Sequence, residues 1–300
     1  MLGNWLLTWY LFLGGVGAGL FLVSYAVLAL NCRRPRSYSP VMLCKVWPRT
    51  LLIAALALTC GCVCLLKDLT RSGQAFYLLV KPTLSAISIG AYSLIALTIL
   101  IVGLYAVTYR RRDAYHLKLT LLAGAAAAVL AIVVVLYTGV LLQSIAAVPF
   151  WRSPLVMPIF AASSFSSGIG CFALVNASVF RERTLLLEEY GMALNVDTAV
   201  LLAEVVFIAC FAFGLVDAYG PDVLANFMPG GSCLQAFWAG VVALGIVSPL
   251  ILYRMPFSHI RTGYGLFLTA GCASVAGAFF LRYCFIFGGI HISSIILLGV

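Results

Sequence analysis

Six side chains in this sequence combine a proton-exchanging or hydrogen-bonding group with a position inside, or at the edge of, a long apolar run. Such groups are costly at membrane depth and for that reason indicate functional sites. Carboxylates can exchange protons, and phenol hydroxyls can donate a hydrogen bond to a ligand. The candidates are Tyr10, Asp68, Tyr137, Glu204, Asp217 and Arg282.

Glu204 is the deepest of these charges. It lies about six residues, or ~9 Å, from the predicted cytoplasmic end of its helix. A carboxylate at that depth is either paired with a cation or part of a proton route, and we favour the proton route. Asp217, at the outer end of the same predicted helix, is the second candidate for this route. Asp68 and Arg282 lie near the outer ends of two other predicted helices. A structural ion pair at the membrane boundary is the alternative for these two.

Tyr10 and Tyr137 lie at matching predicted depths, each about five residues, or ~7.5 Å, from the outer end of its helix. Tyrosine at such a position is commonly an interfacial belt residue. Thr138 and Gly139 follow Tyr137, so its hydroxyl could meet a ligand beside a thin stretch of helix. We expect the two phenols and Asp68 to approach one another near the outer surface.

The elements that hold these residues are apolar helices. Of the 300 residues, 64% are hydrophobic and only 9% are charged, whereas soluble domains carry about 25% charged residues. A transmembrane helix needs about 20 apolar residues, and the chain offers eight such runs in a single polytopic domain, residues 1–300. We therefore predict an all-α integral membrane protein with transmembrane helices at 5–30, 48–66, 82–108, 117–142, 155–179, 198–216, 237–253 and 263–287.

Basic residues predict the orientation of these helices. The first, third, fifth and seventh loops carry thirteen of the eighteen Lys and Arg residues. Cytoplasmic loops are enriched in Lys and Arg, so these loops are predicted to be cytoplasmic. Both termini are then on the outer, periplasmic face.

Several classes of site are excluded by what the sequence lacks. The histidines, His116, His259 and His291, all lie at or beyond predicted helix ends, so a bis-histidine haem inside the bilayer is not expected. The ten cysteines lack the paired loop spacings of zinc and iron–sulfur sites, so no metal site is predicted. Basic residues do not alternate with aromatics in a soluble segment, which argues against nucleic-acid binding.

Five stretches, in order along the chain, resemble the NrfD/PsrC family of membrane subunits. Members of this family serve polysulfide reductase and related molybdenum or multihaem respiratory complexes. The stretches are Tyr10–Gly19, Asp68-Leu69, Tyr137–Leu142 followed by Pro149-Phe150-Trp151 and Pro154, Ser163-Ser164 with Gly168, and Leu281-Arg282-Tyr283 with Phe287-Gly288-Gly289.

This resemblance implies eight helices in two four-helix bundles and no haem or iron–sulfur cluster in this chain. It implies a quinone near the outer face, menaquinone rather than ubiquinone, close to Tyr10, Tyr137 and Asp68. This sequence departs from polysulfide reductase in its first helix, where a histidine of polysulfide reductase corresponds to a position near Tyr10, so the hydrogen bonding to the quinone is expected to differ. Arg282 is expected to belong to an ion pair that is either structural or adjacent to the quinone site.

The resemblance also implies partners. A peripheral ferredoxin-like iron–sulfur subunit would dock on the outer face, and through it a molybdenum-type catalytic subunit or a multihaem cytochrome. The protein would exchange electrons with menaquinol or ubiquinol as one subunit of a quinone-linked oxidoreductase in a bacterial or archaeal cytoplasmic membrane, with possible coupling to proton movement. A secondary transporter and a passive membrane anchor are the alternatives.

Overall fold

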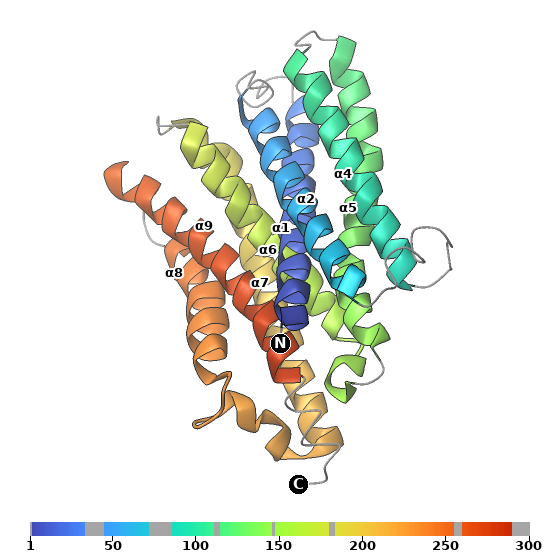
Figure 1. Cartoon of the computed structure of the whole chain (residues 1–300). Helices are drawn as coiled ribbons and strands as arrows, with labels where there is room; N and C mark the ends of the chain where they lie inside the picture. The colour runs from blue at the N-terminus through green and yellow to red at the C-terminus, as the bar shows by residue number, and fades with distance from the viewer. Residues whose placement is uncertain are drawn as a thin grey trace.

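A computed structural model describes residues 2–33, 45–71, 86–110, 115–145, 148–179, 184–254 and 260–289 of the protein. Throughout these residues the regular secondary structure is helical (Figure 1). The principal helices are α1 (Leu2–Arg33), α2 (Trp47–Arg71), α4 (Ala86–Arg110), α5 (Tyr115–Ser144), α6 (Val156–Val179), α7 (Thr184–Tyr219), α8 (Ser248–Arg254) and α9 (Ile260–Tyr283). Shorter segments are η2 (Pro149–Arg152), η3 (Pro221–Phe227), and the π-helical η4 (Ala236–Val247) and η5 (Cys284–Gly288).

Seven of the described helices are long and apolar enough to cross a membrane. An eighth apolar helix, Ala236–Leu252, is shorter and is formed by η4 and the start of α8. The predicted apolar runs therefore correspond to helices, and the molecule is a multi-pass membrane protein. The start of the third predicted helix, residues 82–85, lies outside the described residues.

The helices fall into two groups that share a long seam (Figure 1). α1, α2, α4 and α5 contact one another in a closed ring, and α6 contacts α7 and α9, which in turn contact α8 and η4. The seam is formed mainly by α1 and α5 against α6, with further contacts between α1 and α9. We call α1, α2, α4 and α5 the first bundle and the remaining helices the second bundle. Of the spanning helices, α1 and α6 are the most buried.

Glycine permits the closest approach along this seam. A Cβ on Gly19 would overlap the carbonyl of Ser164, and a Cβ on Gly168 would overlap the backbone of Gly19. In lipid, where apolar side chains gain little by leaving the solvent, small residues drive helix association by letting backbones meet. The glycines of α1 therefore serve helix packing, and they position the residues around them.

Aromatic side chains close the end of the molecule where α1 begins. Phe150 of η2 packs edge-on against Phe211 of α7, with 5.0 Å between the ring centroids. The indole of Trp151 donates a hydrogen bond to the carbonyl of Phe285 at 2.8 Å. The short η2 segment is thereby fixed to α7 and to the last helix.

The sixth predicted helix differs most from the structure, because α7 begins at Thr184 instead of residue 198. The additional turns contain Glu188, Glu189 and Asp197. Charged residues lower the hydropathy of a segment without preventing it from being helical, so hydropathy alone underestimates the length of this helix. The apolar part of α7 spans Leu194–Tyr219.

Candidate functional site

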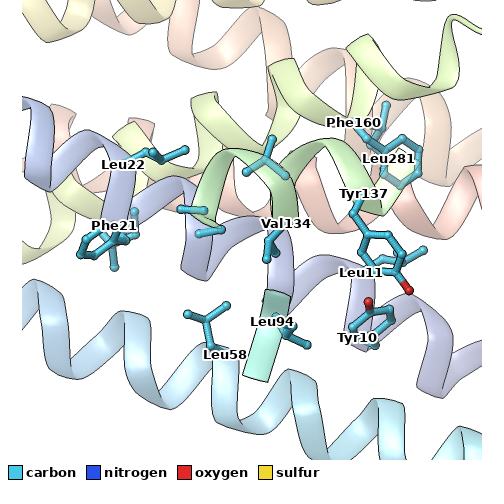
Figure 2. Close-up of a cluster of buried hydrophobic side chains, with 14 of the residues drawn as sticks. Tyr10, Leu11, Phe21, Leu22, Leu58, Leu94, Val134, Tyr137, Phe160 and Leu281 are labelled. Carbon is cyan, nitrogen blue, oxygen red and sulfur yellow. The ribbon is translucent and has the colours of Figure 1, made fainter. Parts of the chain in front are cut away.

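Two buried phenols meet where α1 and α5 lie together. Tyr10 is 2% exposed and Tyr137 is 5% exposed, and a side-chain hydrogen bond joins them. Figure 2 shows their hydroxyl oxygens turned toward one another. Either phenol can donate in this bond, so the pair retains one O–H group that can be donated to a further acceptor.

The pair lies deeper than the sequence predicts. Tyr10 is eight residues after Leu2, and Tyr137 is seven residues before Ser144. At 1.5 Å per residue these distances are about 12 Å and 10 Å from the two helix ends. The two depths are similar, as expected, and the additional depth arises because α1 begins before residue 5 and α5 ends after residue 142, the predicted helix ends.

α2 and α4 supply the other walls around the phenols. Gly90 of α4 lies directly against the Tyr137 ring, and the Gly61 Cβ position on α2 is 3.8 Å from the Tyr10 carbonyl oxygen. Next to Gly61, the Cys62 sulfur lies 3.8 Å from the Thr98 hydroxyl of α4. All four helices of the first bundle therefore converge at this point.

Asp68 lies further toward the end of α2 and is half-buried. It is seven residues beyond Gly61, which corresponds to about 10 Å along the helix. The structure thus brings the two tyrosines into contact and leaves Asp68 nearer the C-terminal end of α2. Its approach to the phenols stays a prediction.

Arg282 is fully buried where α1, α6 and α9 meet. Its Nε donates to the Leu11 carbonyl at 3.1 Å, and Nη1 donates to the Ala278 carbonyl at 2.7 Å. Nη1 and Nη2 also donate to the hydroxyls of Ser163 at 3.1 Å and Ser164 at 2.8 Å. The position is therefore interior, and the direct hydrogen-bond acceptors are neutral oxygens, in contrast to the boundary ion pair considered from the sequence.

Space for this guanidinium depends on Gly15. A Cβ at that residue would lie 2.5 Å from Nη2 of Arg282 and 2.6 Å from the hydroxyl oxygen of Ser164. The ring of Phe160 covers another side, with its centroid 5.4 Å from Cζ. The close backbone at Gly15 and the Phe160 ring together exclude water from the guanidinium. The exclusion of water strengthens the interactions of this cation with nearby charges.

Two buried carboxylates extend from Arg282 into α7. Glu204 is 5% exposed, forms a side-chain hydrogen bond with Ser163, and interacts electrostatically with Arg282 and Asp197. Asp197 is 0% exposed. Because Ser163 accepts a hydrogen bond from Arg282, its own hydroxyl hydrogen can be donated to Glu204. We call Arg282, Ser163, Glu204 and Asp197 the buried polar network.

Asp197 was not identified from the sequence, because the predicted helix began one residue after it. The signal that could have found it was its spacing from Glu204. Seven residues are close to two helical turns, so the two carboxylates share a face of α7. Asp217, in contrast, is exposed near the end of α7. It lies thirteen residues beyond Glu204, about 20 Å along the helix, and does not join this network.

The buried polar network adjoins the phenol pair on α1. Arg282 binds the carbonyl of Leu11, the residue directly after Tyr10. One turn of α1 therefore contributes to both features. Within the described residues there is no group of three or more His, Cys, Asp or Glu side chains that could hold a metal ion.

Comparison with known proteins gives a consistent result. The sequence profile of the family described as "Polysulphide reductase, NrfD" matches residues 4–293. Protein NrfD of Escherichia coli is 26% identical, with 95% of this sequence and 94% of the relative covered. The C subunit of polysulfide reductase from Wolinella succinogenes is 25% identical, with 95% and 93% covered. The protein described here, a multi-pass protein of the bacterial inner membrane, belongs to the NrfD polysulphide reductase family.

Proposed function

We propose that this protein is the quinone-binding membrane subunit of a respiratory oxidoreductase complex. The observation that carries the proposal is the buried, hydrogen-bonded pair of Tyr10 and Tyr137, set about 10–12 Å inside the helix ends. One relative is named as a single lettered subunit of polysulfide reductase, an enzyme of several subunits, which supports a subunit role here.

The residues fit a quinone because its carbonyl oxygens accept hydrogen bonds within an apolar slot. The phenol pair can donate one such bond, while apolar neighbours such as Leu11 and Leu94 exclude water. Asp68, nearer the surface, can exchange protons with the outer solvent. Conversion between quinone and quinol requires two electrons and two protons.

We further propose that the buried polar network stores or carries protons for this exchange. Asp197 and Glu204 can each hold a proton, and the Ser163 hydroxyl can pass one along. Arg282 fixes Ser163 and holds the Leu11 carbonyl beside Tyr10. The groups that can hold or pass a proton extend from α7 to Ser163, whereas the exposed Asp217 would take part only at the surface.

Eight spans, with the termini outside, are part of this proposal. The rings of Trp5 in α1 and Phe287 in η5 lie 5.1 Å apart between centroids, so the first and last helices meet at one end of the molecule. A chain that crosses the membrane an even number of times begins and ends on the same side. Seven crossings come from the long apolar helices, and η4 together with α8 would supply the eighth. The distribution of Lys and Arg favours an outer location for that end.

The electrons would come from, or go to, another subunit, for which we propose a peripheral ferredoxin-like iron–sulfur protein. It would contact the outer loops, of which Gln143–Pro154 and Ala218–Gln235 lie largely among the described residues. Most of the loop between α2 and α4, residues 72–85, lies outside them. Through this subunit a molybdenum-type enzyme or a multihaem cytochrome would be served.

The test is to purify the complex from native membranes and extract its bound quinone. Tyr137→Phe removes one donor, which typically costs ~1 kcal/mol, so we expect the KM for a soluble quinone analogue to rise about fivefold. Tyr25→Phe is the control, since the Tyr25 hydroxyl donates to the Leu121 carbonyl and joins the same two helices elsewhere. A complex without quinone, or equal effects of both substitutions, would count against the proposal.

A secondary transporter is the competing function, because buried charges within membrane-spanning helices also mark transport pathways. Arg282, Glu204 and Asp197 are such charges. A passive anchor would need no buried ionisable group. Co-purification of an iron–sulfur protein together with quinone separates the proposed function from both alternatives.

A further inference from the structure

Gly90 of α4 lies against the edge of the Tyr137 ring. A Cβ built on Gly90 would overlap three ring carbons, Cδ2, Cε2 and Cζ. Cζ is the carbon that bears the hydroxyl. The backbone of α4 therefore limits the position of the phenol at the atom next to its hydrogen-bonding group.

We infer that Gly90 is a positioning residue that holds the Tyr137 hydroxyl toward Tyr10 and toward a quinone oxygen. The inference rests on the proposed quinone site. Since Tyr137 projects from α5 and Tyr10 from α1, neither helix alone determines where the two hydroxyls meet. α4 closes the third side, and only a residue without a side chain leaves room for the ring.

The size of the effect follows from the overlap. To reach an ordinary carbon–carbon separation of ~3.5 Å, the ring must retreat by roughly 1 Å or more. An O–H···O bond of ~2.8 Å that lengthens by the same amount exceeds hydrogen-bond range. A methyl group on α4 would thus separate the phenols without removing either hydroxyl.

The alternative for Gly90 is a purely structural one, in which it allows α4 and α5 to pack and nothing more. Another glycine of the same helix distinguishes the possibilities. A Cβ on Gly103, also in α4, meets no atom within 4 Å. Gly103 should therefore accept alanine.

The experiment compares Gly90→Ala, Gly103→Ala, Tyr137→Phe and Gly90→Ala/Tyr137→Phe in the complex purified with its partner subunits. The measured quantities are the KM and kcat for a soluble quinol or quinone analogue and the yield of assembled complex. A map of the Gly90→Ala complex by electron cryomicroscopy locates the two hydroxyls independently of activity.

We expect Gly90→Ala to raise KM about fivefold, as for the loss of one neutral hydrogen bond. Gly103→Ala should leave KM unchanged. Gly90→Ala in the Tyr137→Phe background should raise KM no further, because the hydroxyl that it displaces is already absent. A structural role would lower assembly in both backgrounds and would not depend on the hydroxyl.

Intact Tyr10–Tyr137 contact in the Gly90→Ala map would overturn the inference, and so would a rise in KM that persists in the Tyr137→Phe background. If Tyr137→Phe itself leaves KM unchanged, the proposed quinone site fails, whatever the map shows of Gly90. If Gly90→Ala does not assemble, Gly90→Ala/Tyr137→Ala should restore assembly to the level of Tyr137→Ala, since the obstructing ring is gone. Failure of that rescue would overturn the inference as well.

Discussion

Replacing Arg282 with methionine tests whether the buried cation stabilises the second bundle through Glu204. The substitution keeps an unbranched side chain and removes all four hydrogen bonds, which go to Leu11, Ala278, Ser163 and Ser164. Ser164 keeps its own bond to the Phe160 carbonyl, at 2.7 Å. The main loss therefore concerns Ser163 and, through it, Glu204.

The magnitude follows from leaving one member of an interacting buried pair without the other. Removing one partner typically costs ~3–5 kcal/mol, because the remaining charge stays buried. We expect Arg282→Met to lower the free energy of unfolding by that amount, measured by equilibrium unfolding in mixed detergent and SDS micelles. Arg282→Met/Glu204→Gln should recover part of the loss, since the uncompensated carboxylate is removed too.

A double-mutant cycle of Arg282→Met and Glu204→Gln measures the interaction energy between the two side chains. Coupled residues show interaction energies of ~0.5–3 kcal/mol, whereas independent ones add within ~0.5 kcal/mol. Gly103→Ala is a suitable control, because a Cβ there contacts nothing. If the costs of Arg282→Met and Glu204→Gln simply add, the two side chains do not stabilise each other, and the reasoning about the buried polar network is refuted.

Three further outcomes are expected. Glu204→Gln and Asp197→Asn should each slow turnover while assembly and quinone content, measured on the purified complex, stay unchanged; wild-type turnover in both would remove the proton route. A reporter fused after Arg112 should behave as cytoplasmic and one fused at Val300 as external, and the reverse pattern would contradict the assigned orientation. The isolated protein should show no b-type haem in its absorption spectrum, and a haem spectrum from this polypeptide alone would be incompatible with the proposed cofactor content.

Sequence reasoning located the helices well, because long apolar runs at low charge have one stable solution in lipid. It located helix ends less well. α7 extends fourteen residues before the predicted start at residue 198, and that difference hid Asp197. The same difference placed Glu204 too near the start of its predicted helix. In the structure Glu204 lies ten residues inside the apolar segment, which begins at Leu194.

The depth of a residue along a helix can be counted from the sequence. The side of the helix that faces a neighbouring helix cannot be identified in this way when most residues on every side are apolar. Tyr10 and Tyr137 were therefore predicted at matching depths without evidence that they face each other. Arg282 was predicted near an outer boundary, and its interior position depends on acceptors from α1, α6 and α9. No local pattern in Leu281-Arg282-Tyr283 identifies those distant acceptors.

The glycine crossing between α1 and α6 has a mechanical consequence. Backbone meets backbone at Gly19 and Gly168, so no rotatable side chain separates the helices there and none can absorb a shift by changing rotamer. We therefore expect a displacement of α1, for example when a ligand binds beside Tyr10, to move α6 by a similar amount. Hydrogen exchange should accordingly be slowest along this crossing and faster in α7, whose spanning segment is the least buried in the structure.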